Sequence, residues 1–288
     1  MKNKLFIALI LFNFLVGFGF ILYPSIGNLL TLSTASVSIS EYEEKVVELV
    51  PKSDVRLDLA RAFNEHLYRG TAREDEDKVL NTDNGMICYL DIPKIDVYLP
   101  VYYGTGDEAL SKGVGYIEHT SLPVGGPNTN TGLSGHTGLP GAELFSSLDK
   151  LEKKDCFYIH VMGEILAYEV FEIAVVEPDD SELAEIEPGR DLATLVTCTP
   201  YGINSHRLLV RGERIPYTPE VESADAVSEQ SVKKGLSSTV KRQILVIAAI
   251  AGFALFLLLI GVLYSRRQLG KHQKETLNAR AEKEKDKN

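Results

Sequence analysis

Cys198 places a nucleophilic side chain at the end of a predicted strand. Leu195 and Val196 belong to a β-prone run, whereas Pro200 cannot donate to a central strand ladder and the residues after it are typical of a turn. A second apolar run opens at Arg207, and we expect the returning strand to bring that guanidinium beside the sulfur. A neighbouring cation favours the thiolate, which attacks carbonyl groups, and stabilises charge on the attacked oxygen. This spacing alone leaves open that Cys198 is a small buried hydrophobe, as free cysteines often are.

A thiol nucleophile needs an acid–base partner, and His136 is the histidine best placed for that role. It lies in a short, glycine-rich polar segment, so we expect its imidazole to be exposed at a strand end. An imidazole titrates near neutral pH, so it can protonate a leaving amine and deprotonate an incoming one. His119 also lies near loop residues and stays an alternative. The other histidines have simpler interpretations: His66 in a helical pattern, His160 in an alternating strand, His272 in a basic tail, and His206 facing away from Arg207.

Ordered motifs run through the middle of the chain. They include Ile-Pro-Lys-Ile at 92–95, Leu-Pro-Val-Tyr-Tyr-Gly-Thr at 99–105, Ser-Gly-His-Thr-Gly-Leu-Pro at 134–140, and the run 194–211. Together these segments, from about residue 85 to 214, resemble the sortases, and specifically the class C, pilin-polymerising sortases. The resemblance places the catalytic histidine, cysteine and arginine of that family on His136, Cys198 and Arg207. It also implies a mostly β fold, an eight-stranded barrel with short helices.

The resemblance implies an extracytoplasmic cysteine transpeptidase. Cys198 would cleave a Leu-Pro-x-Thr-Gly-like sorting signal between threonine and glycine, leaving a thioester, while His136 protonates the departing amine and Arg207 stabilises the oxyanion. A lysine amine of the next pilin would then form an isopeptide bond. The implied partners are pilin subunits with such signals and the lipid bilayer, and the chemistry needs no metal or organic cofactor.

Three other interpretations stay open. A housekeeping sortase, which attaches surface proteins to peptidoglycan, would differ in the amine that resolves the thioester. A non-catalytic scaffold at the pilus base would need no thiol. A cell-wall L,D-transpeptidase would need a histidine shortly before a Ser-x-Gly-Cys run, which the residues around Cys198 do not supply.

The chain departs from class C sortases at one point. Those enzymes usually carry a lid whose Asp-Pro-aromatic motif plugs the active site, and no Asp-Pro dipeptide occurs in this sequence. The corresponding segment, 69–78, is short, acidic and lacks an aromatic residue. We expect the lid to be absent or reduced to a remnant. An aromatic side chain from residues 65–84 packed on Cys198 would contradict this hypothesis.

Two apolar runs predict membrane attachment. Residues 5–23 follow Lys2 and Lys4 and approach the roughly 20 residues that span a bilayer, although a cleavable signal peptide is the competing interpretation. Residues 244–264 contain no charged side chain and precede Arg266 and Arg267. Because basic flanks stay in the cytoplasm, we expect two spans, both termini cytoplasmic and the intervening catalytic region outside.

Charge and cysteine use fit this arrangement. Residues 24–240 hold 36 Asp and Glu against 18 Lys and Arg, which argues against nucleic-acid binding. Cys88 and Cys156 lie in apolar, strand-like stretches, and we expect buried thiols there, with a disulfide between them as the less frequent alternative. The paired ligand spacings of a zinc site are absent.

The expected organisation follows from these patterns. Residues 41–68 have helical spacing, which Pro51 divides into two helices, with Ser53 or Asp54 capping the second. Strands are predicted at 87–92, 97–101, 132–134, 156–161, 165–176, 193–198 and 207–213, and a short helix at 142–148. The expected regions are a membrane anchor (1–23), a helical region with an acidic lid remnant (24–84), a catalytic barrel (85–215), a polar linker (216–242), a transmembrane helix (243–264) and a basic cytoplasmic tail (265–288).

Overall fold

The computed structural model describes residues 2–48, 50–73, 76–139, 141–178 and 184–218, with isolated positions between 245 and 261. By its internal contacts the chain divides into two units, Met1–Thr239 and Val240–Asn288. The predicted second span and the basic tail belong to the second unit and lie largely outside the described residues, as does most of the predicted linker. The fold described below is that of the first unit.

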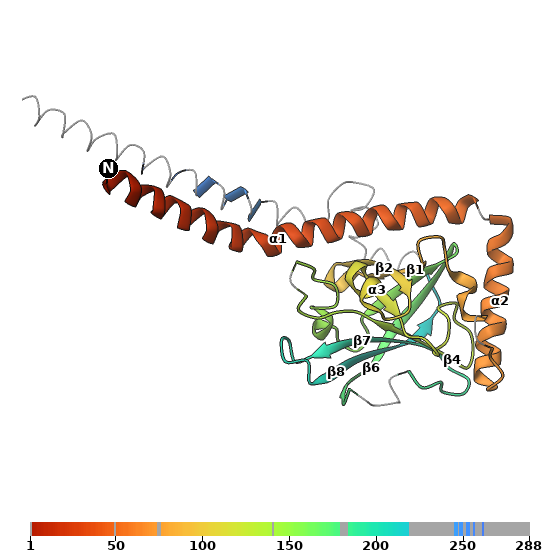
Figure 1. The fold of residues 1–288 in the computed structure, drawn as a ribbon. Helices are drawn as coiled ribbons and strands as arrows, with labels where there is room; N and C mark the ends of the chain where they lie inside the picture. The colour runs from red at the N-terminus through yellow and green to blue at the C-terminus, as the bar shows by residue number, and fades with distance from the viewer. Residues whose placement is uncertain are drawn as a thin grey trace, which may run out of the picture. The chain divides into compact units, whose positions relative to one another are not determined.

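Two helices precede the β domain. Helix α1 covers Lys2–Glu48 and α2 covers Val50–Tyr68, so the predicted anchor and the first predicted helix form one continuous element. The axis of α1 changes direction part-way along (Figure 1), and Pro24, which lacks a backbone donor, lies inside the helix. Pro51 lies at the start of α2, where its missing N–H costs nothing. The predicted cap at Ser53 or Asp54 is wrong, because α2 begins before both.

One stretch of the described residues is long and apolar enough to cross a membrane. It is Val16–Glu48 within α1, with a mean hydropathy of 1.3 and 6% of its most apolar window buried in the protein. This stretch overlaps the predicted anchor and extends beyond it.

Buried polar contacts fasten both helices to the β domain. The Tyr42 hydroxyl of α1 donates to the carbonyl of Ile87 at 3.0 Å and accepts from the N–H of Met162 at 2.9 Å. The Asn64 side chain of α2 exchanges two hydrogen bonds with the backbone of Leu122, at 3.1 and 2.7 Å. Because a buried polar group left without a partner costs about 1–3 kcal/mol, these pairs fix where the helices sit.

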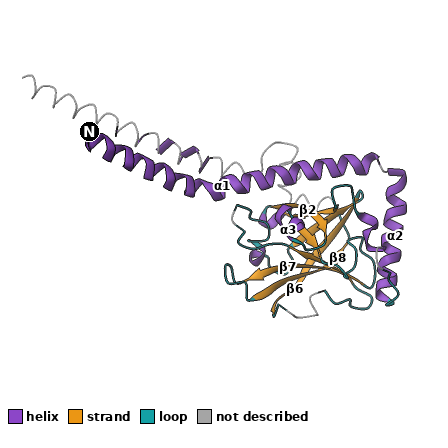
Figure 2. Cartoon of the chain, viewed as in Figure 1, coloured by secondary structure: helices purple, strands orange, loops and turns teal. Residues whose placement is uncertain are grey.

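The β domain is a closed barrel of eight strands, as the resemblance implies (Figures 1 and 2). The strands, numbered along the chain, follow one another around the barrel in the order β1-β2-β3-β4-β7-β8-β6-β5. Pairing is antiparallel except between β2 and β3 and between β4 and β7. The strands are β1 (Met86–Ile92), β2 (Val97–Tyr103), β3 (Val114–Tyr116), β4 (Thr129–Ser134), β5 (Cys156–Val161), β6 (Glu164–Val176), β7 (Asp191–Thr199) and β8 (His206–Ile215).

Every strand predicted from the sequence is confirmed, and the structure adds β3 and a short helix. Strand β3 has three residues with Gly115 at its centre, which is too short and too glycine-rich for an alternating pattern. The added helix, α3, spans Asp107–Lys112. The predicted helix at 142–148 is wrong. The N–H of Phe145 bonds to the carbonyl of His136 at 3.1 Å, so this segment is a folded loop that ends in a 3-10 turn, Leu148–Lys150.

The barrel interior is filled by large aromatic and aliphatic side chains, among them the fully buried Tyr116, Phe145, Phe157 and Tyr168. Cys88 and Cys156 are buried free thiols, as predicted, and burial raises the pKa of Cys88 well above its usual range. The Cys88 thiol is therefore a poor nucleophile.

The acidic segment that the sequence identifies with a lid docks, in its described part, on the barrel. A 3-10 turn, Glu76–Leu80, carries Asp77, which accepts a hydrogen bond from the Tyr103 hydroxyl on β2. Leu80 of the same turn is fully buried. This turn is thereby anchored to the barrel wall.

His160 makes the stability of the barrel pH-dependent. Its ring is 7% exposed on β5 and stacks on Tyr89 at 4.4 Å, and burial lowers its pKa from 6.5 to about 4. Between these values the unfolded chain binds a proton that the folded chain does not, so stability present above pH 6.5 is lost as the pH falls toward 4. We expect this histidine to remove about 2 kcal/mol of unfolding free energy between pH 7 and pH 5.

A His160→Phe variant keeps the ring stacking and removes the titration. Urea unfolding of the detergent-solubilised chain at the two pH values should show a smaller difference for this variant than for the parent. Equal differences would contradict the assignment.

Candidate active site

Cys198 and Arg207 are direct partners across the antiparallel pair β7 and β8. Residues paired in this way project to the same face of the sheet, with Cβ atoms about 4.5–5.5 Å apart. Both side chains are partly exposed, at the point where β7 ends and the turn to β8 begins. The structure therefore brings together the two residues that the sequence places nine positions apart, and it leaves the thiol accessible rather than buried.

His136 follows the end of β4, on the other side of β7. In the parallel pair, Ser134 lies opposite Val196, and the N–H of Gly135 bonds to the Val196 carbonyl at 3.0 Å. The pairing thus continues past β4, and the next positions along the two chains are those of His136 and Cys198. The Thr197 hydroxyl donates to the Gly135 carbonyl at 2.7 Å, which fixes this extension. His136, Cys198 and Arg207 therefore lie in one row across three neighbouring chain segments.

The backbone around His136 is tightly held. A Cβ on Gly135 would come within 2.7 Å of the Phe145 ring, so only glycine fits there. The loop after His136 folds back through the bond from Phe145 N–H to the His136 carbonyl, and the N–H of Gly138 donates to Ser146 Oγ at 3.1 Å. Gly138 has φ +71° and packs near the Tyr201 ring of the β7–β8 turn. The loops that carry the histidine and flank the cysteine therefore meet.

The other histidines occupy different places. His119 lies between Ile117, whose N–H bonds to the Gly132 carbonyl at 2.9 Å, and Thr120, whose hydroxyl accepts from the Gly132 N–H at 3.0 Å. Gly132 is four residues before His136, about 13 Å along an extended chain, which separates His119 from Cys198. His66 is exposed on α2, His160 is buried in β5, His206 lies 3.4 Å from a Glu177 carboxylate, and His272 falls outside the described residues.

A charged network lies on the same strand face as Arg207 and was not predicted from the sequence. Arg211 donates to Glu172 on β6 at 2.6 Å and to Glu187, in the β6–β7 connection, at 2.5 Å. Arg190 bonds to Glu187 and, at 2.8 and 3.1 Å, to Glu213 of β8. The guanidinium carbon of Arg190 lies 4.3 Å from the centre of the Phe171 ring, and that of Arg211 lies 5.3 Å from it. These hydrogen bonds lower the pKa values of Glu187 and Glu213.

This network attaches the end of the β6–β7 connection to β8, on the strand face that carries Arg207. Alternate residues of β8 share a face, so Arg211 lies on the face of Arg207, with Leu209 between them. The one sequence signal for the network is this spacing of arginines on β8, because its other members become neighbours only in the folded barrel.

The described part of the chain holds no cluster of His, Cys, Asp or Glu side chains that could bind a metal ion. Tyr201 and Ile203 in the β7–β8 turn are 71% and 72% exposed, an unusual position for large apolar side chains. The site thus offers a thiol, a guanidinium and an imidazole beside an apolar surface. That combination suits covalent acyl transfer from a peptide.

Comparison with known proteins gives the same family by sequence and by structure. Residues 90–215 match the Sortase domain. A sortase C of Clostridium perfringens, solved with its C-terminal cell wall sorting motif, is 45% identical, with a TM-score of 0.60, and the match covers 64% of this chain and all of that one. The Streptococcus pneumoniae sortase C is 47% identical, with a TM-score of 0.58, over 63% and 97% of the two chains.

One curated relative matches over a shorter range. Sortase A of Streptococcus agalactiae is 32% identical over 149 residues, which are 51% of this chain and 58% of that protein. The chain therefore spans less than two thirds of the length of this relative.

The fold and the site define a closed β-barrel with a partly exposed free cysteine at a strand end. The chain belongs to the sortase family, whose members are cysteine transpeptidases.

Proposed function

We propose that this protein is a class C sortase, which cleaves a Leu-Pro-x-Thr-Gly-like sorting signal and joins pilin subunits through lysine isopeptide bonds. The observation that carries the proposal is the direct pairing of Cys198 with Arg207, with His136 two residues past the end of β4 on the other side of β7, in a Sortase domain. The 45% and 47% identity to two solved sortase C structures supports the subclass.

Cys198 is the nucleophile in this proposal. Its thiolate attacks the carbonyl carbon between threonine and glycine, and the electron pair of the C=O bond moves to oxygen. Arg207 lies directly opposite, and among the described residues it donates long hydrogen bonds to the backbone carbonyls of Asn204 and His206, at 3.4 and 3.2 Å. Its guanidinium is thus placed to orient the peptide and to stabilise the oxyanion.

His136 acts as the general acid and then as the general base. Collapse of the tetrahedral intermediate breaks the C–N bond, and the departing glycine amine takes a proton from the imidazolium, which leaves a thioester on Cys198. A lysine amine then attacks the thioester while the imidazole accepts its proton, the C–S bond breaks, and Cys198 leaves as the thiolate as the isopeptide bond forms. The partly exposed position of His136, level with Cys198, supports both roles.

The enzyme works outside the membrane in this proposal, held by two spans with both termini cytoplasmic. The apolar α1 and the basic residues at each end of the chain support this placement. We also propose that no aromatic plug from residues 65–84 covers Cys198. The partial exposure of Cys198 and the docking of Asp77 on Tyr103 support an open site.

Cys198→Ala should abolish acyl-enzyme formation, because the thioester needs the sulfur. The full chain in detergent is mixed with a sorting peptide, and intact mass reports the adduct, which hydroxylamine should release. The matched control is Cys156→Ala, which removes a buried thiol on β5 and should leave the adduct unchanged. An adduct on the Cys198→Ala chain would contradict the proposal. An adduct that forms only after residues 65–84 are altered would contradict the open site alone.

The choice of acceptor separates pilin polymerisation from anchoring to peptidoglycan. We expect a lysine-bearing pilin segment to resolve the thioester at least tenfold faster than a cell-wall peptide amine. Because the ordinary lysine pKa is about 10.4, the rate should rise with pH as the free amine becomes more abundant. Product masses from a competition between the two acceptors measure this preference. Resolution by the cell-wall amine alone would favour a housekeeping sortase.

The segment 177–191 should contact the sorting signal, because the charged network holds its end on the Arg207 face. Arg211→Met frees Glu187 from one of its partners, and we expect KM for the peptide to rise severalfold while kcat changes less. Arg61→Met is the control, because it breaks a comparable ion pair, 2.7 Å from Glu164, elsewhere on the barrel. Unchanged KM and unchanged preference among signal variants would remove the segment from the recognition site.

A further inference from the structure

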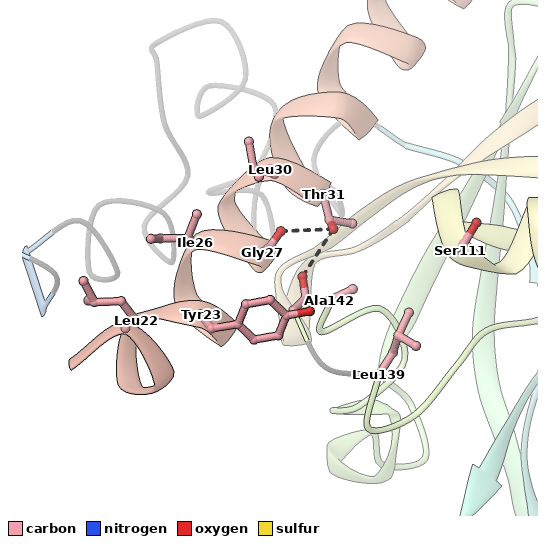
Figure 3. Close-up of a pocket in the computed structure, with 11 residues that line it drawn as sticks. Leu22, Tyr23, Ile26, Gly27, Leu30, Thr31, Ser111, Leu139 and Ala142 are labelled. Carbon is pink, nitrogen blue, oxygen red and sulfur yellow. Dashed lines mark hydrogen bonds between the residues drawn. The ribbon is translucent and has the colours of Figure 1, made fainter. Parts of the chain in front are cut away.

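Helix α1 touches the loop that follows His136 at three points along the helix. A Cβ placed on Gly27 would lie 2.7 Å from Gly141 Cα, so the two backbones are in direct contact. The Asn28 side-chain oxygen, on a residue that is 4% exposed, accepts the N–H of Glu143 at 3.0 Å. The Thr31 hydroxyl lies 3.3 Å from the Gly141 carbonyl and 3.2 Å from the Gly27 carbonyl of its own helix, so its one hydrogen is shared between them (Figure 3).

These contacts come directly after the predicted membrane anchor, 1–23, and they reach the active site through few bonds. Glu143 lies two residues before Phe145, whose N–H holds the His136 carbonyl. The path from helix to imidazole therefore runs through one short loop.

The contact area around these bonds is loosely packed. A pocket of about 560 Å³ opens beside them, lined by apolar residues of α1 and by the loop. Figure 3 shows Leu22, Tyr23, Ile26 and Leu30 on the helix side of this pocket, with Leu139 and Ala142 on the loop side. Leu144 and Phe145 bury the far end of this loop in the barrel core. Residues 141–143 contact α1 through backbone approach and hydrogen bonds, so the position of that part of the loop should depend on single residues of α1.

We propose that α1 is a positioning element of the active site, and that Gly27, Asn28 and Thr31 hold the His136 loop in its working geometry. This inference rests on the proposed role of His136 as acid and base. A general acid must lie within hydrogen-bond reach of the departing amine, and a displacement of about 1 Å costs on the order of a hundredfold in rate. The anchor helix thus does more than tether the barrel to the membrane.

The first test compares two glycine substitutions on the same helix. Gly27→Leu puts a side chain into the Gly141 backbone, whereas Gly17 has nothing within 4 Å of its Cβ position, so Gly17→Leu is the matched control. In the full chain in detergent, we expect Gly27→Leu to lower the rate of acyl-enzyme formation at saturating peptide tenfold to a hundredfold, with KM within about twofold. Gly17→Leu should match the parent.

Two measurements separate positioning from general damage. Alkylation of Cys198 by iodoacetamide should stay within about twofold of the parent, because β7 is held by its own pairing with β4 and β8. Thr31→Val removes the bond to Gly141 without changing side-chain size, and we expect it to slow acylation about threefold. Its control is Thr34→Val, because the Thr34 hydroxyl bonds within its own helix, to Leu30.

The outcomes are distinguishable. If the parent chain forms no acyl-enzyme, the proposed function fails. If the parent is active and both variants acylate as fast as their controls, the positioning role of α1 is wrong. If Gly27→Leu does not fold, the Thr31 and Thr34 pair decides, since those isosteric changes preserve the helix.

Discussion

The register of β7 against its two neighbours is the constraint on which the active site depends. Side chains alternate between the two faces of a strand, so a slip of one residue would turn Cys198 away from Arg207 and from the His136 segment. Burial prevents such a slip, because Leu195 of β7 and Val210 of β8 are register partners and both are fully buried in the barrel. The stability of the core and the geometry of the site therefore have the same origin.

Arg207 and Arg211, both on β8, differ in their hydrogen-bond partners. Arg211 is held by the carboxylates of Glu172 and Glu187, whereas the hydrogen bonds of Arg207 in the described part of the chain go to backbone carbonyls. A guanidinium that is already paired with carboxylates stabilises a developing oxyanion only weakly. A guanidinium that lies beside a thiol and bonds only to backbone carbonyls can stabilise it more strongly. The network keeps its acidic residues on Arg211 and Arg190, away from the catalytic end of the strand.

The place of Cys198 near a strand end, its pairing with Arg207 and the barrel strands could be predicted from the sequence because their signals are local. A strand broken by Pro200, a returning run that opens at Arg207 and a polar glycine-rich segment at His136 each lie within a few residues. Strand β3 was not predicted, because three residues are too few to show the alternating apolar pattern of a strand. The helix predicted at 142–148 is wrong because a tertiary bond to His136 takes the Phe145 N–H. The charged network and the α1 contacts join residues far apart in sequence, so no local pattern indicates them.

Three segments adjoin the strands that carry Cys198 and Arg207: the β7–β8 turn, the β6–β7 segment and the His136 loop. Each is held by a different kind of interaction. The β7–β8 turn closes on itself, with the N–H groups of Ile203 and Asn204 bonding to the Pro200 carbonyl. The β6–β7 segment is held by partly exposed ion pairs, which salt screens. The His136 loop is held by neutral contacts with a helix that continues into the predicted anchor. Salt should therefore loosen the β6–β7 segment before it disturbs the His136 loop, whereas a displacement of α1 should affect the His136 loop first.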